Sequence, residues 1–68
     1  MRLKELRKQR HCTLQNVADA IGVSNGIVAN YENEKRDPNI ATLIKLADYF
    51  DVSVDYLIGH EKTPNHLE

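Results

Sequence analysis

Apolar residues recur at helical spacing in several stretches of this chain, and polar residues separate those stretches. Between residues 40 and 50 the apolar side chains return every three or four positions, at Ile40, Leu43, Leu46, Ala47 and Phe50. The twenty residues from Leu14 to Asn33 hold two shorter segments of the same kind on either side of a Gly-Val-Ser turn. The pattern therefore predicts amphipathic helices.

We predict five short helices, no strand, and a compact all-α bundle over residues 1–59. Residues 60–68 have no periodicity and are expected to form a flexible C-terminal tail. The helices are expected at about 1–11, 14–21, 25–33, 40–50 and 54–58. Their common core is expected to hold Leu3, Leu6, Val17, Ile21, Val28, Leu43, Leu46, Phe50 and Leu57.

Helix ends are marked by residue type. Hydroxyl or amide side chains that can cap the first N–H groups precede four of the segments, at Thr13, Ser24, Asn39 and Ser53. Gly22 and Gly59 are placed to end helices with a positive φ. Since Gly22 makes the first turn tight and Ala18 is small, the helices at 14–21 and 25–33 can cross closely as a helix-turn-helix.

The spacing of Ala18, Gly22 and Val28 resembles the helix-turn-helix of lambda-repressor-like regulators, also called the Cro/cI or XRE type. The similarity runs from Leu3 to Gly59. It includes further matching positions on both sides of the motif: Leu3, Leu6, Arg7, Val17, Ile21, Val23, Tyr31-Glu32 and Lys35-Arg36-Asp37-Pro38. The resemblance implies a sequence-specific regulator that binds double-stranded DNA, most simply a repressor.

In that family the second helix of the motif enters the major groove. The resemblance then assigns base contacts to Asn25, Gly26, Ile27, Ala29 and Asn30. Asparagine can pair with adenine through two hydrogen bonds, and alkyl groups contact the thymine methyl. We expect Asn25 and Asn30 to read adenine, and Ala29 or Ile27 to meet thymine. Gly26 either allows closer approach to DNA or is tolerated at a helix start.

The family positions that meet the DNA backbone assign phosphate contacts to polar and basic residues around the motif. They are Arg10, Thr13, Gln15, Ser24, Asn33, Lys35 and Arg36. Two positions depart from the family pattern. Leu14 stands where the family has a glutamine that contacts phosphate and braces a recognition side chain, so either Gln15 takes over or that anchor is absent. Glu34 stands where a glycine is usual, and its charge opposes DNA.

Two further expectations follow from the resemblance. Arg7 and Glu32 should form a largely buried salt bridge. A two-fold dimer should contact through the last helix and the C-terminal side of the helix at 40–50, where Tyr56, Leu57 and Ile58 supply apolar surface, with Leu57 also serving the core. Such a dimer places its recognition helices about 34–36 Å apart on a palindromic operator.

Length and composition argue against membrane-spanning, disulfide-bonded and catalytic proteins. At 68 residues the chain is one domain, and it lacks an apolar run near the roughly 20 residues that span a bilayer. The single cysteine, Cys12, excludes an internal disulfide and suits a reducing cytoplasm. We expect Cys12 to be a small buried apolar residue, with a redox or metal thiolate as the alternative. The sequence predicts no catalytic residues, no metal and no cofactor.

The net charge of −1 is unusual for a DNA-binding domain. Its distribution is uneven, because Arg2, Lys4, Arg7, Lys8 and Arg10 lie near the start and acidic residues gather later. Together with Leu14, Glu34 and the uncharged 25–33 face, this charge favours the alternative of a protein-interaction module on a degenerate helix-turn-helix. A C-terminal domain beyond this sequence, or a protein effector, is also left open.

Overall fold

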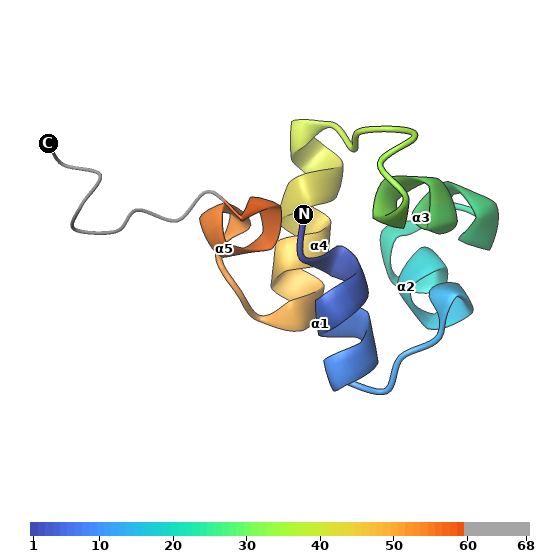
Figure 1. The fold of residues 1–68 in the computed structure, drawn as a ribbon, viewed down its shortest axis with the longest axis horizontal. Coiled ribbons are helices and arrows are strands. Elements are labelled where there is room, and N and C mark those ends of the chain that lie inside the picture. Colours follow the sequence, from blue (N-terminus) through green and yellow to red (C-terminus); the bar gives the residue numbers. More distant parts are fainter. Residues whose placement is uncertain (60–68) are drawn as a thin grey trace, which may run out of the picture.

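The computed structural model describes residues 1–59 and places them in five α-helices (Figure 1). The helices are α1 (Leu3–Gln9), α2 (Leu14–Ile21), α3 (Asn25–Glu32), α4 (Ile40–Phe50) and α5 (Val54–Ile58). No strand occurs in this part of the chain. The predicted all-α fold is confirmed, whereas the proposed tail at 60–68 lies outside the described residues.

The four predicted N-caps are all present. Thr13 Oγ1 accepts a hydrogen bond from the backbone N–H of Asn16 at 3.0 Å, and Asn16 Oδ1 accepts one from the N–H of Thr13 at 3.0 Å. The side chains of Ser24, Asn39 and Ser53 accept equivalent bonds from the third residue beyond them. These bonds satisfy N–H groups that have no partner within their helix, which explains why α2, α3, α4 and α5 begin where the sequence predicts.

Two predicted helices are shorter than expected. α1 begins at Leu3 because Arg2 donates its backbone N–H to the carbonyl of Leu57 at 2.7 Å, which draws the start of the chain to α5. It ends at Gln9 because His11 adopts a left-handed backbone with φ +56°. α3 ends at Glu32, and Asn33 is its C-cap. Gly22 and Gly59 end α2 and α5 with positive φ, as predicted.

The core contains every predicted residue except Leu43, which is half-buried. Ala18, Tyr31 and Ala47 are buried with them. Ile40, the first residue of the apolar stripe but not one of the predicted core residues, is 67% exposed at the start of α4. Burial along α4 is partial at Leu43 and complete at Leu46, so the first turn of the helix extends past the packed layer.

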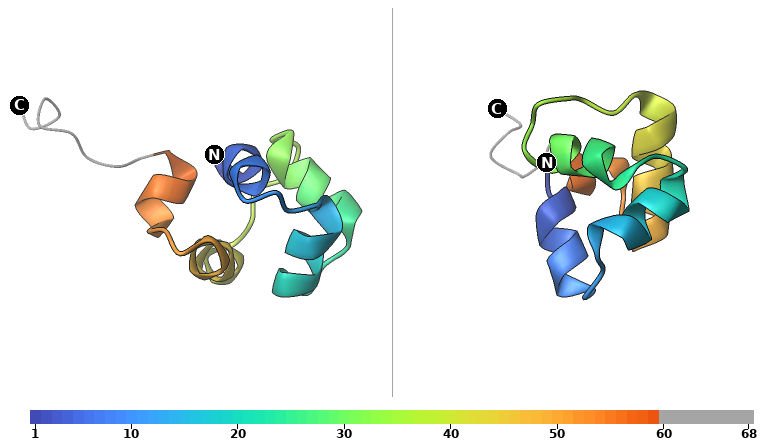
Figure 2. Two further views of the ribbon diagram at one scale, coloured as in Figure 1. Left: turned by 90° about the horizontal axis from the view of Figure 1, so that it is seen from below. Right: turned by 90° about the vertical axis from the view of Figure 1, so that its right-hand side faces the viewer.

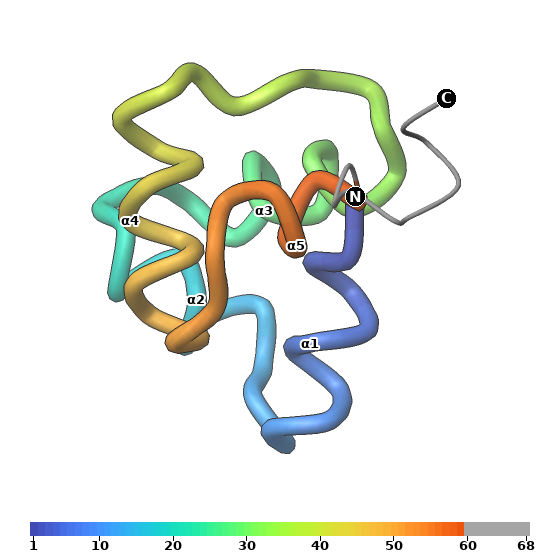
Figure 3. Tube along the Cα trace, turned by 90° about the vertical axis from the view of Figure 1, so that its left-hand side faces the viewer, coloured from blue at the N-terminus to red at the C-terminus, as the bar shows by residue number. Residues whose placement is uncertain are grey.

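The motif and α5 lie at opposite ends of the molecule, with α1 and α4 between them (Figures 1 and 2). α2 packs against α3 and α4, α4 packs against α5, and α1 packs against α3. Figure 3 shows α5 on the side away from the motif, next to α1 and α4. None of the helices at residues 1–59 is long and apolar enough to cross a membrane.

Candidate nucleic-acid interface

α3 is held by one face and leaves the opposite face open. Val28 and Tyr31 point into the core, where Val28 is fully buried together with Ala18 of α2. Asn25, Gly26 and Asn30 are exposed, and Ile27 and Ala29 are half-buried. The five residues assigned to base contacts are therefore all at least partly accessible on α3. The right-hand panel of Figure 2 looks onto this end of the molecule.

The expected ion pair between Arg7 and Glu32 is present and joins α1 to the end of α3. Arg7 Nε lies 2.5 Å from Glu32 Oε2, and Nη2 lies 3.2 Å from Oε1, so the guanidinium meets the carboxylate with two parallel bonds. The side chains are only 15% and 5% exposed. The hydrogen bond to Glu32, more than the opposing effect of burial, raises the pKa of Arg7. The two charges thus connect α1 to the end of α3.

The same guanidinium also reaches the loop before the motif. Arg7 Nη1 donates to the carbonyl oxygen of Cys12 at 3.1 Å. Cys12 immediately precedes Thr13, the N-cap of α2. Arg7 therefore positions both helices of the motif, one through its carboxylate partner and the other through the backbone.

Gln15 contacts Asn25, a residue predicted to meet a base, from one position later than the glutamine of the family pattern. Asn25 Nδ2 donates to Gln15 Oε1 at 3.2 Å, and Gln15 Nε2 donates to Asp19 Oδ1 at 2.8 Å. Leu14 is half-buried and packs against the core instead. Gln15 on α2 thus holds Asn25 on α3 by a hydrogen bond, while Leu14 contributes to packing. Asp19 was not predicted; its i,i+4 spacing from Gln15 on α2 is the signal that could have indicated it.

Gly26 is not required by packing. A Cβ built at this position would approach only Ser24 Oγ, at 3.9 Å, which is an ordinary contact. Inside the protein there is therefore room for a larger residue, and the reason for glycine must lie in what approaches α3 from outside or in simple tolerance.

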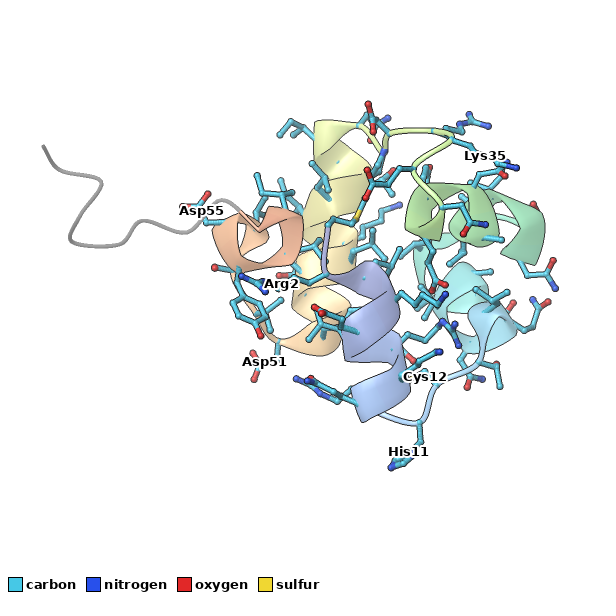
Figure 4. All side chains as sticks on the ribbon, viewed as in Figure 1. Arg2, His11, Cys12, Lys35, Asp51 and Asp55 are labelled. Carbon is cyan, nitrogen blue, oxygen red and sulfur yellow. The ribbon has the colours of Figure 1, made fainter. Side chains whose placement is uncertain are left out.

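The residues predicted to contact phosphate come from the end of α1, from α2, from the caps of α2 and α3, and from the segment after α3. Thr13 and Ser24 use their oxygens as acceptors in helix caps, which leaves each hydroxyl hydrogen available to an outside oxygen. Arg10, Asn33, Lys35 and Arg36 are exposed. Figure 4 labels Lys35 on the segment that follows α3.

Glu34 places an acidic side chain next to the basic residues Lys35 and Arg36. It follows the C-cap of α3 in a left-handed conformation, with φ +59°. Its carboxylate lies 3.8 Å from the amino group of Met1, and its side chain is 76% exposed. The pairing is therefore weak in water, and the charge of Glu34 stays accessible beside Lys35.

Cys12 is half-buried rather than fully buried, so the prediction for it was only partly right. Its sulfur lies 3.6 Å from Tyr49 Oη and 3.6 Å from the carbonyl of Arg10. The hydrogen bond with Cys12, aided by burial, raises the pKa of Tyr49. Among residues 1–59 no group of three or more His, Cys, Asp and Glu side chains is arranged to hold a metal ion.

The residues expected at a dimer interface differ in accessibility. Leu57 is completely buried, so the structure excludes its side chain from an interface and assigns it to the core. Tyr56 and Ile58 are 37% and 39% exposed. The guanidinium of Arg2 lies 4.6 Å from the centre of the Tyr56 ring and donates from Nε to the carbonyl of Tyr56 at 2.9 Å. This contact covers one side of the ring and attaches α5 to the start of the chain.

Comparison with known proteins identifies the family. The sequence profile of the family described as helix-turn-helix matches residues 3–57. The chain belongs to the helix-turn-helix family of the Cro/cI, or XRE, type. The matched region runs from the start of α1 into α5, so the family pattern covers the whole described bundle apart from its ends.

Several curated relatives carry names of regulators. The chain is 44% identical over 61 residues to the HTH-type transcriptional regulator AnsR of Bacillus subtilis, covering 90% of this chain and 53% of that protein. It is 39% identical over 67 residues to the regulator ImmR of the same organism, covering 98% and 53%. It is 34% identical over 67 residues to the cryptic phage CTXphi transcriptional repressor RstR of Vibrio cholerae, covering 98% and 60%.

The chain thus spans about half the length of the curated relatives it matches. No solved structure gave a significant match.

Proposed function

We propose that this chain is a sequence-specific domain that binds double-stranded DNA and reads the major groove with α3, as part of a transcriptional repressor. The observation that carries the proposal is the two-sided character of α3. Val28 and Tyr31 anchor it in the core, while Asn25 and Asn30 extend outward. Relatives named as transcriptional regulators, one of them a phage repressor, support the same function.

The chemistry of the exposed face favours A·T pairs. Each asparagine amide offers an acceptor and a donor side by side, which matches the N6–H and N7 of adenine in the major groove. Ile27 and Ala29 are accessible alkyl groups that suit the thymine methyl. Arg10, Lys35 and Arg36, with the capping hydroxyls of Thr13 and Ser24, would hold the phosphates on either side.

A homodimer completes the proposal. Single domains of this size bury little surface on DNA, and two half-sites multiply the affinity. The N-terminal end of α3 points away from α5 (Figure 1), although Tyr31 near its other end lines a pocket together with Ile58. Contact through Tyr56 and Ile58 would therefore leave the N-terminal half of both recognition helices free. The half-sites would then form a palindrome with centres about 34–36 Å apart.

Selection of binding sites from random duplex DNA tests these points together. We expect the selected sequences to show dyad symmetry and A·T-rich half-sites. The Asn25→Ala/Asn30→Ala variant should bind the selected duplex at least ~30-fold more weakly, because two base contacts of about 1–3 kcal/mol each are lost.

The matched control removes two exposed polar side chains elsewhere, in Gln9→Ala/Thr41→Ala, and should retain wild-type affinity. Unchanged affinity of the asparagine variant would show that α3 does not read the DNA.

A further inference from the structure

Two hydrogen bonds link three polar side chains across the motif, from Asn25 to Gln15 and from Gln15 to Asp19. The ionised carboxylate of Asp19 can only accept hydrogen bonds, so Gln15 must turn its NH₂ group toward it, at 2.8 Å. Gln15 Oε1 is then the atom left to face α3, where it accepts from Asn25 Nδ2 at 3.2 Å. Consequently the Oδ1 of Asn25, and the second hydrogen of its Nδ2, are the groups not used by Gln15.

We propose that Asp19 determines the base preference of Asn25 without touching DNA, by setting the orientation of two successive amide groups. The inference rests on the proposed function of α3. An asparagine that presents its oxygen beside one N–H matches adenine, which offers a donor at N6 and an acceptor at N7. Guanine offers acceptors at both O6 and N7, so the same orientation places oxygen against oxygen.

Asp19 is needed because it fixes which way the amide groups of Gln15 and Asn25 are turned. An amide can rotate by half a turn and exchange its oxygen with its NH₂ group, and Gln15 and Asn25 could pair with each other in either sense. Only a partner that cannot donate removes one of the two arrangements. Asp19 is that partner, since it is exposed, lies one turn after Gln15 on α2, and bonds to Gln15 rather than to the backbone.

If the hydrogen bond between Gln15 and Asp19 only stabilised α2, its removal would have a different effect. A hydrogen bond between side chains four residues apart stabilises its own helix slightly and changes the melting temperature. A bond that acts only on helix stability does not alter the ratio of affinities for two duplexes that differ at one base pair. The ratio is therefore the measurement that separates a positioning residue from a surface contact.

The test compares two duplexes that carry A·T or G·C at the pair read by Asn25. That pair is identified in the selected operator as the one at which Asn25→Ala loses its preference. In Asp19→Ala, removal of a negative charge near phosphate should strengthen binding to both duplexes. The preference for A·T over G·C should nevertheless fall by about 3- to 10-fold, because Asn25 can now turn its NH₂ group toward guanine.

Asp48→Ala is the matched control, since it removes an exposed aspartate from the last turn of a helix, on α4 rather than α2. It should leave the preference unchanged. The double variant Gln15→Glu/Asp19→Ala supplies a rescue with the same net charge as the wild type. A carboxylate at position 15 accepts only, so it should orient Asn25 directly and restore most of the preference, even if phosphate repulsion lowers affinity for every duplex.

The outcomes distinguish failure of the proposed role of Asp19 from failure of the proposed DNA binding. A lowered ratio in Asp19→Ala that returns in the double variant supports the inference. A ratio within about 1.5-fold of wild type in Asp19→Ala, or a lowered ratio that the double variant does not restore, overturns it while leaving DNA binding intact. If the wild-type protein selects no sequence at all, the proposed function itself fails and this inference fails with it.

Discussion

Arg7 shows how much of the motif's position depends on one side chain. Its planar guanidinium donates to Glu32 at the end of α3 and to the Cys12 carbonyl before α2. A lysine has a single compact head group and cannot make this fork. Both charges are largely excluded from water, so each depends on the other to offset the cost of its burial.

Replacing Glu32 should therefore be costly. We expect Glu32→Ala to lower the free energy of unfolding by about 3 kcal/mol, because it leaves the largely buried Arg7 charge without its carboxylate partner. Glu32→Gln, which can still accept hydrogen bonds, should lose less. Urea denaturation followed by circular dichroism measures both changes.

Glu5→Ala, which removes an exposed carboxylate from α1, should change stability by less than about 0.5 kcal/mol. If the midpoint of Glu32→Ala equalled that of Glu5→Ala, the pair would contribute no more than a surface contact.

At the scale of the element, the described helices end in the same way. The backbone turns left-handed at or just after each C-terminus, at His11, Gly22, Glu34, Asp51 and Gly59. This turn lets the last carbonyls bond to N–H groups beyond the helix, as in the bond from Lys35 N–H to the Asn30 carbonyl at 2.9 Å. Side chains with a Cβ are strained there, aspartate less than glutamate.

Glycine at these helix ends should stabilise the fold. We expect Glu34→Gly to raise the free energy of unfolding by about 1 kcal/mol, because it relieves the left-handed strain. Asp51→Gly should gain less, since aspartate tolerates this conformation better. Thermal and urea unfolding of the two variants provide the comparison.

Glu34→Gln separates strain from charge, because it keeps the Cβ and removes the carboxylate. It should leave stability nearly unchanged, although like Glu34→Gly it should strengthen DNA binding. A glutamine variant as stable as the glycine variant would attribute the gain to charge instead.

For the whole molecule, the arrangement of charge matters more than its total of −1. Lys35 lies at the end of the molecule that carries the motif, whereas Asp51 and Asp55 lie toward α5 (Figure 4). The segment after α3 holds Lys35 and Arg36 next to Glu34 and Asp37, so under the proposed function the attraction to phosphate must come from the local placement of these two basic side chains.

Salt dependence tests this account against the alternative of a protein-interaction module. If several phosphates are neutralised, the logarithm of the binding constant should fall linearly with the logarithm of salt concentration between about 50 and 200 mM. Lys35→Ala/Arg36→Ala should reduce the magnitude of that slope by about 2. Fluorescence anisotropy with a labelled operator duplex measures both slopes.

Lys4→Ala/Lys45→Ala removes the same charge from α1 and α4 and should leave the slope close to that of the wild type. Binding that ignores salt in the wild-type protein would favour a protein partner over DNA.

Helix positions were predictable because their causes are local. The caps at Thr13, Ser24, Asn39 and Ser53 act over three residues, and the turn at Gly22 depends on its own φ. Such interactions are fully specified by neighbours along the chain, so the starts of α2 to α5 agree with the sequence pattern. The outward face of α3 follows from the same helical period, although its contacts with DNA stay predictions.

Burial and partner choice were less predictable because they depend on segments distant in sequence. The periodicity puts Ile40 on the same helix face as Leu43 and Leu46, yet Ile40 is 67% exposed, and Leu57, which was expected both in the core and at a partner surface, is completely buried. Asn25 and Gln15 meet only because α2 and α3 cross. The residue pattern was enough for the helices, their ends and the motif. Tertiary packing alone selected which apolar faces are covered and which side chains orient α3, since these contacts join residues that only the folded chain brings together.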